Sequence, residues 1–349
     1  MRRHTGLLAS TTILLGALLL LQVQAAPVYP LPLSNFNFTD TNGMNPSSPT
    51  EGGGGVTLPA GGIQASYVWT SRGTYETFDS GCVLTKERPV PVVLLPGLLS
   101  PGHVTTRYMA HRLQDAGYCV YQLEYGLGMM DTLVGMGDMR ESAKELGAFV
   151  TKVLTLTGVS QVDLMGHAEG NLVSLWYMRK LDGEKNVRTL TSIAPPFHGT
   201  TLRGLTTILK GLNFYDTLAS LTDQLCPACT QVVESSPFLQ SLRTKVMNPP
   251  TLQPAPAPKG PQDGSVKYLV VMTAKDEIIT PWTSAYLDDL EGGDEKGKVT
   301  HVVVEDICEY GVGTSFRHLG IMFSPLVFAI VDGFLTPGDA RPHLDCQSS

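Results

Sequence analysis

The chain has 349 residues, of which 42% are hydrophobic and 16% are charged, and its formal net charge is −7 at pH 7. Such a chain can bury one large core, so we expect a single domain with tails rather than several domains. The mildly acidic balance, without any basic run, argues against a nucleic-acid-binding protein.

The first 25 residues have the three-part pattern of a secretory signal peptide. Arg2 and Arg3 form the basic start, residues 7–21 form an apolar stretch, and small residues just before Ala26 supply a cleavage site. The alternative is an uncleaved membrane anchor, but the apolar stretch is short for a span and the cleavage site follows it directly. We therefore expect a secreted, extracellular protein with no membrane span after cleavage.

Residues 26–63 are rich in Pro, Ser, Thr, Asn and Gly, which predicts a flexible leader without a core of its own. Asn37 begins an Asn-Phe-Thr sequon and is a candidate glycosylation site. The folded domain is expected over residues 64–349. A Pro-rich patch at residues 248–264 is expected as a surface excursion inside it.

Short apolar segments alternate with amphipathic segments along the rest of the chain. Strands are predicted over residues 91–95, 118–125, 161–166, 187–194, 268–274 and 300–306, and helices over 139–158, 168–181 and 319–335. This alternation predicts an α/β fold with a mostly parallel sheet and helices on both faces. In such sheets ligands bind beyond the carboxyl ends of the strands.

An apolar stripe marks the region of residues 202–245. Its members recur at helical spacing: Leu202, Leu205, Ile208, Leu209, Leu212 and Leu218. The stripe fits a helical cap or lid over an acyl-binding cleft, and it fits a core-facing helical insertion equally well.

The segment VDLMGHAEGN, residues 162–171, has the order strand, tight turn, helix that surrounds a nucleophile elbow, G-x-S-x-G. Gly166 and Gly170 supply the small neighbours that the strained turn needs. The central residue, however, is Ala168 instead of serine. Ser174 lies inside the following helix and cannot replace the missing hydroxyl. The pattern therefore predicts an elbow without its nucleophile.

Candidate partners of the elbow follow later strands in the order acid, then base. Asp276 follows the strand at 268–274, and His318 follows the last strand. Either residue alone is usually structural, but their types and order together favour an acid–base pair. Glu277 is a fallback acid, and Asp306 is a weaker one.

An oxyanion hole needs two backbone N–H groups that point at the developing charge. We expect one from Glu169, directly after the elbow position, and one from Leu98, in the loop after the first apolar strand. The Glu169 side chain is interpreted as a first-turn carboxylate that suits the helix dipole, not as a nucleophile.

Six cysteines in a chain with a signal peptide suggest three disulfides, although their spacing leaves the pairing open. Cys226-Pro-Ala-Cys229 has the spacing of a redox or zinc motif. No second CxxC and no His-rich cluster accompanies it, so a local disulfide is the simpler interpretation.

From Cys82 to Cys346 the chain resembles the secreted class 2 triacylglycerol lipases and carboxylesterases. The resemblance rests on RPVPVVLLPG, GYCVYQLEYG, VDLMGHAEG, APPFHGTT, CPACTQVVESSPFLQSL, TAKDEIITP and HLGIMFSP. It implies an α/β-hydrolase fold with a helical cap or lid insertion, a Ser–Asp–His triad, acyl-ester substrates, and neither metal nor organic cofactor. It also implies the disulfide pairs Cys82–Cys119, Cys226–Cys229 and Cys308–Cys346.

On matching positions, the resemblance makes Asp276 the acid, His318 the base and Ala168 the seat of the nucleophile. The chain departs from the family pattern at Pro96, Glu169 and Asn171, which a hydrolase tolerates, and at Ala168, which it does not. The resemblance therefore argues for the fold more strongly than for the activity.

Three functions are compatible with these residues. The first is a monomeric lipase relative with impaired catalysis that binds lipid or a partner. The second is an active triacylglycerol lipase or carboxylesterase of lipid catabolism, with an unseen nucleophile or a water activated by His318. The third is a secreted structural or adhesive protein. The sequence does not favour it, because it shows neither repeats nor an unusual composition. Ligand binding without turnover would single out the first.

Overall fold

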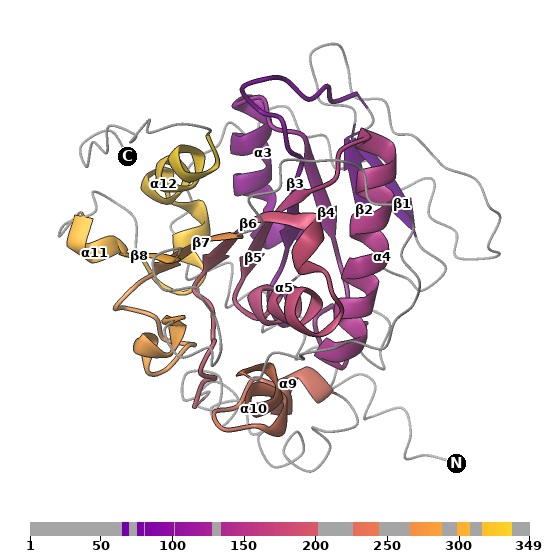
Figure 1. Cartoon of the computed structure of the whole chain (residues 1–349). Coiled ribbons are helices and arrows are strands. Elements are labelled where there is room, and N and C mark those ends of the chain that lie inside the picture. Colours follow the sequence, from indigo (N-terminus) through magenta and orange to yellow (C-terminus); the bar gives the residue numbers. More distant parts are fainter. Residues whose placement is uncertain are drawn as a thin grey trace, which may run out of the picture. The chain divides into compact units, whose positions relative to one another are not determined.

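An eight-stranded β-sheet organises the protein, as the computed structural model shows (Figure 1). The structure describes residues 65–69, 75–79, 81–100, 102–127, 134–201, 226–243, 266–287, 299–307 and 316–336. All of them belong to the second of two units of the chain, residues 53–349. The expected signal peptide, the leader with Asn37 and residues 202–225 of the expected cap lie outside the described residues.

The strands follow the spatial order β1-β2-β4-β3-β5-β6-β7-β8. Their bounds are β1 Ala65–Trp69, β2 Tyr75–Asp79, β3 Val92–Leu95, β4 Val120–Leu123, β5 Val162–His167, β6 Val187–Ile193, β7 Lys267–Met272 and β8 Val299–Val303. The six strands from β3 to β8 run parallel to one another, whereas β2 pairs antiparallel with both β1 and β4 at one edge of the sheet. The predicted mostly parallel sheet is confirmed, and each of the six predicted strands is present.

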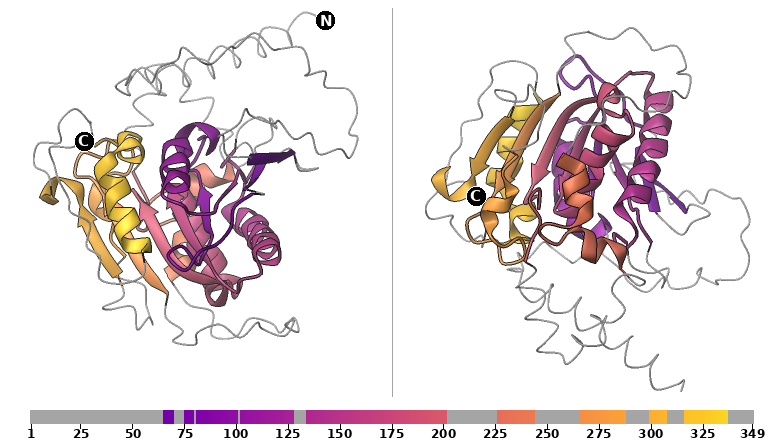
Figure 2. Two further views of the ribbon diagram at one scale, coloured as in Figure 1. Left: turned by 90° about the horizontal axis from the view of Figure 1, so that it is seen from above. Right: turned by 60° about the horizontal axis from the view of Figure 1, so that its bottom comes forward.

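Helices cover both faces of this sheet (Figures 1 and 2). Helices α4 and α5 lie on one face, and α3 and α12 lie on the other. The helical bounds are α2 Gly102–Thr105, α3 Arg107–Asp115, α4 Met139–Thr157, α5 Glu169–Lys180, α9 Pro227–Gln231, α10 Pro237–Arg243, α11 Val304–Ile307 and α12 Pro325–Leu335, with short 3-10 turns at η2 Glu184–Asn186, η3 Trp282–Ala285 and η4 Gly320–Phe323.

The central strand β3 shows how one apolar segment supplies both cores. Val93 and Leu95 pack in the cluster with α4 and α5, whereas Val92 and Leu94 pack in the cluster with α3 and α12. Successive side chains of a strand point to opposite faces, so a strand covered on both sides must be apolar throughout. This is why the segment before Pro96 has no polar residue.

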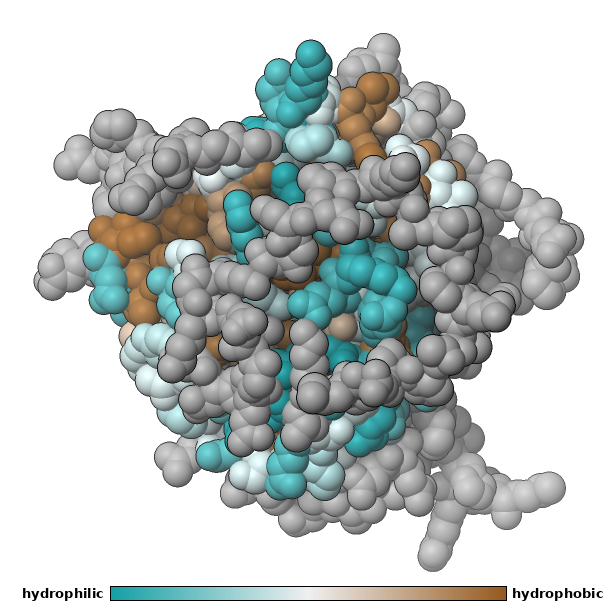
Figure 3. Space-filling view, in the orientation of Figure 1, coloured by the Kyte–Doolittle hydropathy of each residue, from teal (hydrophilic) through white to brown (hydrophobic). Residues whose placement is uncertain are grey.

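Polar and apolar residues gather on different parts of the surface (Figure 3). Polar residues cover the outside of α4, whereas apolar residues gather on the side of α12 and β8.

Helix α4 begins at the N-cap Asp138, whose side chain accepts a hydrogen bond from Arg140 N, and ends at Gly158 with a φ of 71°. The predicted helix over 139–158 is thus confirmed to within one residue.

The single helix predicted over residues 319–335 is wrong in its first turn. The segment forms η4 and then α12, with a break at Ser324. Ser324 precedes Pro325, and the proline ring excludes α-helical backbone from the residue before it. Ser324 is accordingly extended, at φ −86° and ψ 124°, and its hydroxyl caps α12 by accepting from Val327 N.

The sequence analysis assigned no element to residues 65–79 or 102–115, where the structure has two strands and two helices. It also extended the last strand to residue 306, whereas β8 ends at Val303 and α11 begins at Val304. The two strands and α2 have only four or five residues each, which is too short for a clear periodic signal. Helix α3 is different, because its buried residues Met109, Ala110 and Leu113 recur at helical spacing in the sequence.

The described part of the expected cap packs against the helices of the main body. Phe238 of α10 stacks on Trp176 of α5, with ring centroids 4.8 Å apart. Gln231 of α9 accepts a hydrogen bond from Met139 N at 2.8 Å, where α4 begins. Residues 226–243 are therefore seated on α4 and α5, as a core-facing insertion would be.

Two of the three implied disulfides are confirmed. Cys82 bonds Cys119, which ties the segment before β3 to the start of β4, and Cys226 bonds Cys229. The second bond makes the CxxC a local disulfide, as expected. Cys308 and Cys346 lie outside the described residues. In the described ranges no helix has the length and apolar character needed to cross a membrane.

Candidate active site

Ala168 occupies a sharp turn between strand β5 and helix α5. Its backbone has φ 47° and ψ −119°, a conformation that costs a residue with a side chain on the order of 1–3 kcal/mol. Ala168 N donates to the Ile193 carbonyl at 3.0 Å, which ties the turn to the end of β6. The turn therefore has the strained strand-to-helix geometry that a nucleophile elbow requires.

Both glycines beside this turn are needed for steric reasons. A Cβ at Gly166 would lie 2.4 Å from Asn171 Oδ1 and 2.8 Å from Asn171 N. A Cβ at Gly170 would lie 2.7 Å from the Pro96 carbonyl and 2.8 Å from the Leu95 carbonyl. Only glycine lets α5 pack this closely on β5 and β3, so the expectation of small neighbours holds at both positions.

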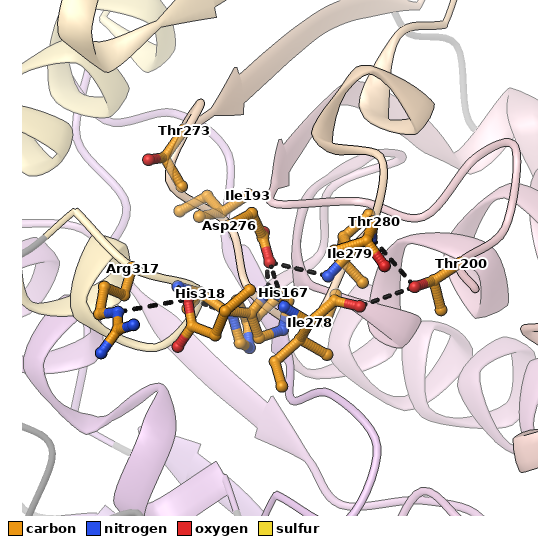
Figure 4. Close-up of polar contacts among 12 residues, drawn as sticks. His167, Ile193, Thr200, Thr273, Asp276, Ile278, Ile279, Thr280, Arg317 and His318 are labelled. Carbon is orange, nitrogen blue, oxygen red and sulfur yellow. Dashed lines mark hydrogen bonds and ion pairs between the residues drawn. The ribbon is translucent and has the colours of Figure 1, made fainter. Parts of the chain in front are cut away.

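Asp276 and His318 meet although they are 42 residues apart (Figure 4). Asp276 lies in the loop after β7, and His318 lies just before η4. His318 Nδ1 is 2.9 Å from Asp276 Oδ2, and both side chains are almost completely buried. The structure thus brings the two predicted partners together as an acid–base pair.

The loop backbone fixes the Asp276 carboxylate. Its Oδ1 accepts from Ile278 N at 2.9 Å and from Ile279 N at 2.8 Å. Burial acts to raise the pKa of Asp276, but the charge and hydrogen bond of His318 and these two N–H groups outweigh it and lower the pKa. Asp276 is therefore an ionised acceptor, and the proton of the contact belongs to His318 Nδ1.

The same pair sets the basicity of His318. Burial acts to lower the pKa of His318, but the charge and hydrogen bond of Asp276, with a smaller effect of Glu277, raise it above its usual value. With Nδ1 bonded to Asp276, Nε2 is the nitrogen that can take a proton from a nucleophile. This is the arrangement that a general base needs.

The two fallback acids have other positions. Glu277 Oε2 accepts from the His318 backbone N at 3.1 Å and lies 3.8 Å from Arg317 Nε (Figure 4). Glu277 therefore contacts the backbone of His318 and not its imidazole ring. Asp306 is exposed on α11. Asp276 is thus the acid that contacts the imidazole.

His167 is a site residue that the sequence analysis did not single out. Its Nε2 is 3.0 Å from the His318 carbonyl oxygen, and the two rings lie 4.8 Å apart (Figure 4). Burial, and to a smaller extent the nearby charge of His318, lowers the pKa of His167 to about 3. His167 is therefore neutral and donates this hydrogen bond. The sequence gives no sign of this role, because His167 occupies a variable position of the elbow motif. Only its contact with His318 in the folded protein shows it.

The expected oxyanion donors border the Ala168 turn. A Cβ at Gly97 would lie 3.0 Å from Ala168 Cβ, so the loop containing Leu98 passes directly over the elbow. Among the described residues, no acceptor faces the backbone N–H of Leu98 or of Glu169. Ser174, in contrast, is fully buried and donates to the Gly170 carbonyl at 2.7 Å, so its hydroxyl is engaged inside α5.

The Glu169 side chain lies in the first turn of α5, as expected, but its surroundings disfavour the charged form. It is only 1% exposed, and burial raises its pKa well above the usual range. Desolvation therefore disfavours the ionised form of this carboxyl group more than the helix dipole favours it.

No group of three His, Cys, Asp or Glu side chains in the described ranges could hold a metal ion. The described residues around the elbow instead supply a buried Asp276–His318 pair and a strained turn at Ala168. Acyl transfer through a covalent nucleophile uses such a pair and such a turn.

Comparisons with known proteins agree with this fold. The family model for lipase (class 2) matches residues 89–249. Aspergillus fumigatus lipase B superposes with a TM-score of 0.53 at 20% identity, over 77% of this chain and 57% of that one, so the chain spans less than two thirds of that lipase. The mature Bacillus licheniformis lipase BlEst2 gives a TM-score of 0.51 at 16% identity, over 75% of this chain and 98% of that one.

The search of curated proteins found no match. At these identities the solved structures establish the fold, which is that of the α/β-hydrolases. The family match adds support for kinship with the class 2 lipases.

Proposed function

We propose that this chain is a secreted lipase-family protein that binds lipid acyl esters and has lost efficient ester hydrolysis because Ala168 occupies the position of the nucleophile. The observation that carries the proposal is Ala168, which holds the backbone of a nucleophile elbow beside the hydrogen-bonded Asp276–His318 pair. The turn, the base and the acid remain, and the hydroxyl of the nucleophile is missing.

The size of the expected loss of turnover distinguishes an impaired enzyme from an active one. Removing the nucleophile of a serine hydrolase lowers turnover by about a millionfold, or about 8 kcal/mol of transition-state stabilisation. Oxyanion binding and substrate positioning can leave roughly 10³–10⁴-fold acceleration over water. Such a remnant is compatible with ligand binding but too small for an efficient lipase.

The choice of an acyl-ester ligand rests on the family match and on the site chemistry, which needs no cofactor. Secretion is supported by the signal-peptide pattern, and the disulfide Cys82–Cys119 is compatible with an oxidising compartment. Within the expected cap of residues 202–245, the residues before Cys226 remain our candidate for a cover over the acyl chain.

The remaining residues would complete the reaction once a hydroxyl is supplied. In the Ala168→Ser variant, His318 Nε2 takes the hydroxyl proton while the oxygen attacks the ester carbonyl. The backbone N–H groups of Leu98 and Glu169 bind the oxyanion that forms. His318 then gives the proton to the departing alcohol, which leaves the acyl group on the serine oxygen. In the second half, His318 takes a proton from water while that water attacks the acyl group, and the proton passes to the serine oxygen as the acid leaves.

The test compares hydrolysis of p-nitrophenyl esters of several chain lengths by the mature protein, by Ala168→Ser and by Ala168→Ser/His318→Ala. We expect turnover from Ala168→Ser alone. A fluorescent ester analogue titrated into the unmodified protein should bind without being cleaved.

Comparable turnover by the unmodified protein would refute the proposal. It would favour attack by a water that His318 activates, and that activity should then disappear on His318→Ala. Inactivity of Ala168→Ser would also refute it, because the remaining site would not be competent.

A further inference from the structure

The carboxyl group of Glu169 is buried next to the elbow without a hydrogen-bond partner. Neither Oε1 nor Oε2 has a donor or acceptor among the described residues, although the side chain is only 1% exposed. A buried polar group without a partner usually costs 1–3 kcal/mol or more, so its presence calls for an explanation.

This carboxyl lies behind the loop that is expected to bind the oxyanion. A Cβ at Gly135 would lie 3.4 Å from Glu169 Oε2, 3.1 Å from Leu98 Cα and 3.0 Å from the Gly97 carbonyl oxygen. The carboxyl and this loop therefore both border the position that a Gly135 side chain would occupy. The backbone N–H of Glu169 itself is the other expected oxyanion donor.

Among the described residues, no cation acts to lower the pKa of Glu169, and burial alone raises it. Tyr125, which follows β4, is the titratable group that Glu169 affects. Burial first, and then the charges of Glu169 and Glu145, raise the pKa of Tyr125, so Glu169 and Tyr125 disfavour each other's negative charge. Tyr125 is also engaged, because its hydroxyl donates to the Pro96 carbonyl at 2.7 Å. Desolvation is the cause that raises the pKa of Glu169.

We propose that Glu169 is a second residue that limits catalysis: negative charge can develop at the oxyanion site only while the Glu169 carboxyl is protonated. This inference rests on the proposed function. It implies that Ala168→Ser restores full turnover only in the lower part of the pH range, and that a neutral residue at position 169 is needed to extend it.

The physical reason is repulsion inside a dry site. A protonated Glu169 is neutral and leaves the oxyanion donors unopposed, as a glutamine would. An ionised Glu169 places a negative charge behind the loop that must stabilise a second one, where little water screens the two. Glutamine has the same shape and no charge, so Glu169→Gln removes the repulsion without opening a cavity.

The experiment measures kcat/KM for p-nitrophenyl butyrate between pH 5 and 10 in Ala168→Ser and in Ala168→Ser/Glu169→Gln. We expect similar values at low pH and a loss on the order of 10–100-fold at high pH in the single variant only. Ala168→Ser/Glu234→Gln is the matched control, because Glu234 is exposed, and its profile should follow that of Ala168→Ser.

A ratio between the first two variants that does not change with pH overturns the role of Glu169 and leaves the proposed function standing. Activity of the double variant where Ala168→Ser is inactive at every pH also overturns the inference, because a protonated Glu169 should leave Ala168→Ser active at low pH. It would refute as well the proposal that a hydroxyl at position 168 is enough to restore hydrolysis. Inactivity of both variants at every pH overturns both proposals.

Protein stability gives a second measurement that needs no turnover. The unfolded chain ionises Glu169 at the usual carboxyl pKa, whereas the raised pKa keeps the folded form protonated. The unmodified protein should therefore lose stability relative to Glu169→Gln as pH rises above that value. A urea midpoint difference that is constant from pH 4 to 9 would show that Glu169 is not a buried neutral acid and would overturn the inference.

Discussion

His167 donates a hydrogen bond from Nε2 to the backbone carbonyl of His318, at 3.0 Å and across 151 residues of sequence. A carbonyl oxygen can only accept, so the proton of the neutral imidazole is on Nε2. The elbow strand thereby holds the backbone of the general base. His167 directly precedes Ala168, so this hydrogen bond links the elbow to the segment that carries His318.

Loss of this contact should misplace the base. In the Ala168→Ser background, His167→Phe should lower kcat about 10–100-fold with little change in KM, because a small displacement of a catalytic group is costly. His167→Gln keeps an N–H at similar reach and should retain most of the activity. Equal losses in the two variants would mean that His167 acts through packing alone. The assay is p-nitrophenyl ester hydrolysis at a fixed pH.

Gly170→Ala should destabilise the fold by about 1–3 kcal/mol, because its Cβ would lie 2.7 Å and 2.8 Å from two backbone carbonyl oxygens that cannot move aside. Gly81→Ala is the matched control, since no atom lies within 4 Å of its Cβ position. Urea unfolding followed by circular dichroism measures both. A Gly170→Ala midpoint equal to that of Gly81→Ala would contradict the close packing of α5 on β3.

The two disulfides should contribute unequally to stability. Cys82 and Cys119 are separated by 37 residues, whereas Cys226 and Cys229 are separated by 3. In the loop-entropy model, removal of the first bond costs about 4 kcal/mol and removal of the second about 2 kcal/mol. Paired Cys→Ala variants and thermal unfolding test this order. A larger effect of the Cys226–Cys229 pair would instead place its contribution in the native packing of α9 and α10.

The Asp276–His318 pair should set the acid limb of activity. Catalysis needs neutral His318, and its pKa is raised, so turnover should fall as pH drops through a value above the ordinary 6.5. The measurement uses Ala168→Ser/Glu169→Gln, which removes the proposed alkaline limit. Adding Asp276→Asn should lower kcat on the order of 10⁴-fold and move the limb to lower pH. A limb that stays in place would contradict the assignment of Asp276 as the acid.

Local chemistry explains why much of the fold was predictable from the sequence. The run Val92–Leu95 is apolar throughout and must be buried on both faces, and the helix over Met139–Thr157 has a cap at each end. The elbow was predictable for the same reason, because Gly166, Ala168 and Gly170 act within one turn. Pro325 was equally visible, and its effect on Ser324 was overlooked.

The contacts that make a site could not be derived in this way. The sequence determined that β5 ends in a strained turn and that an acid and a base follow later strands. The tertiary structure decided that Asp276 meets His318 and that His167 holds its backbone. It also decided that Glu169 is buried without a partner. Strand order and long-range packing set those distances, and the pKa of a side chain depends on what surrounds it in space.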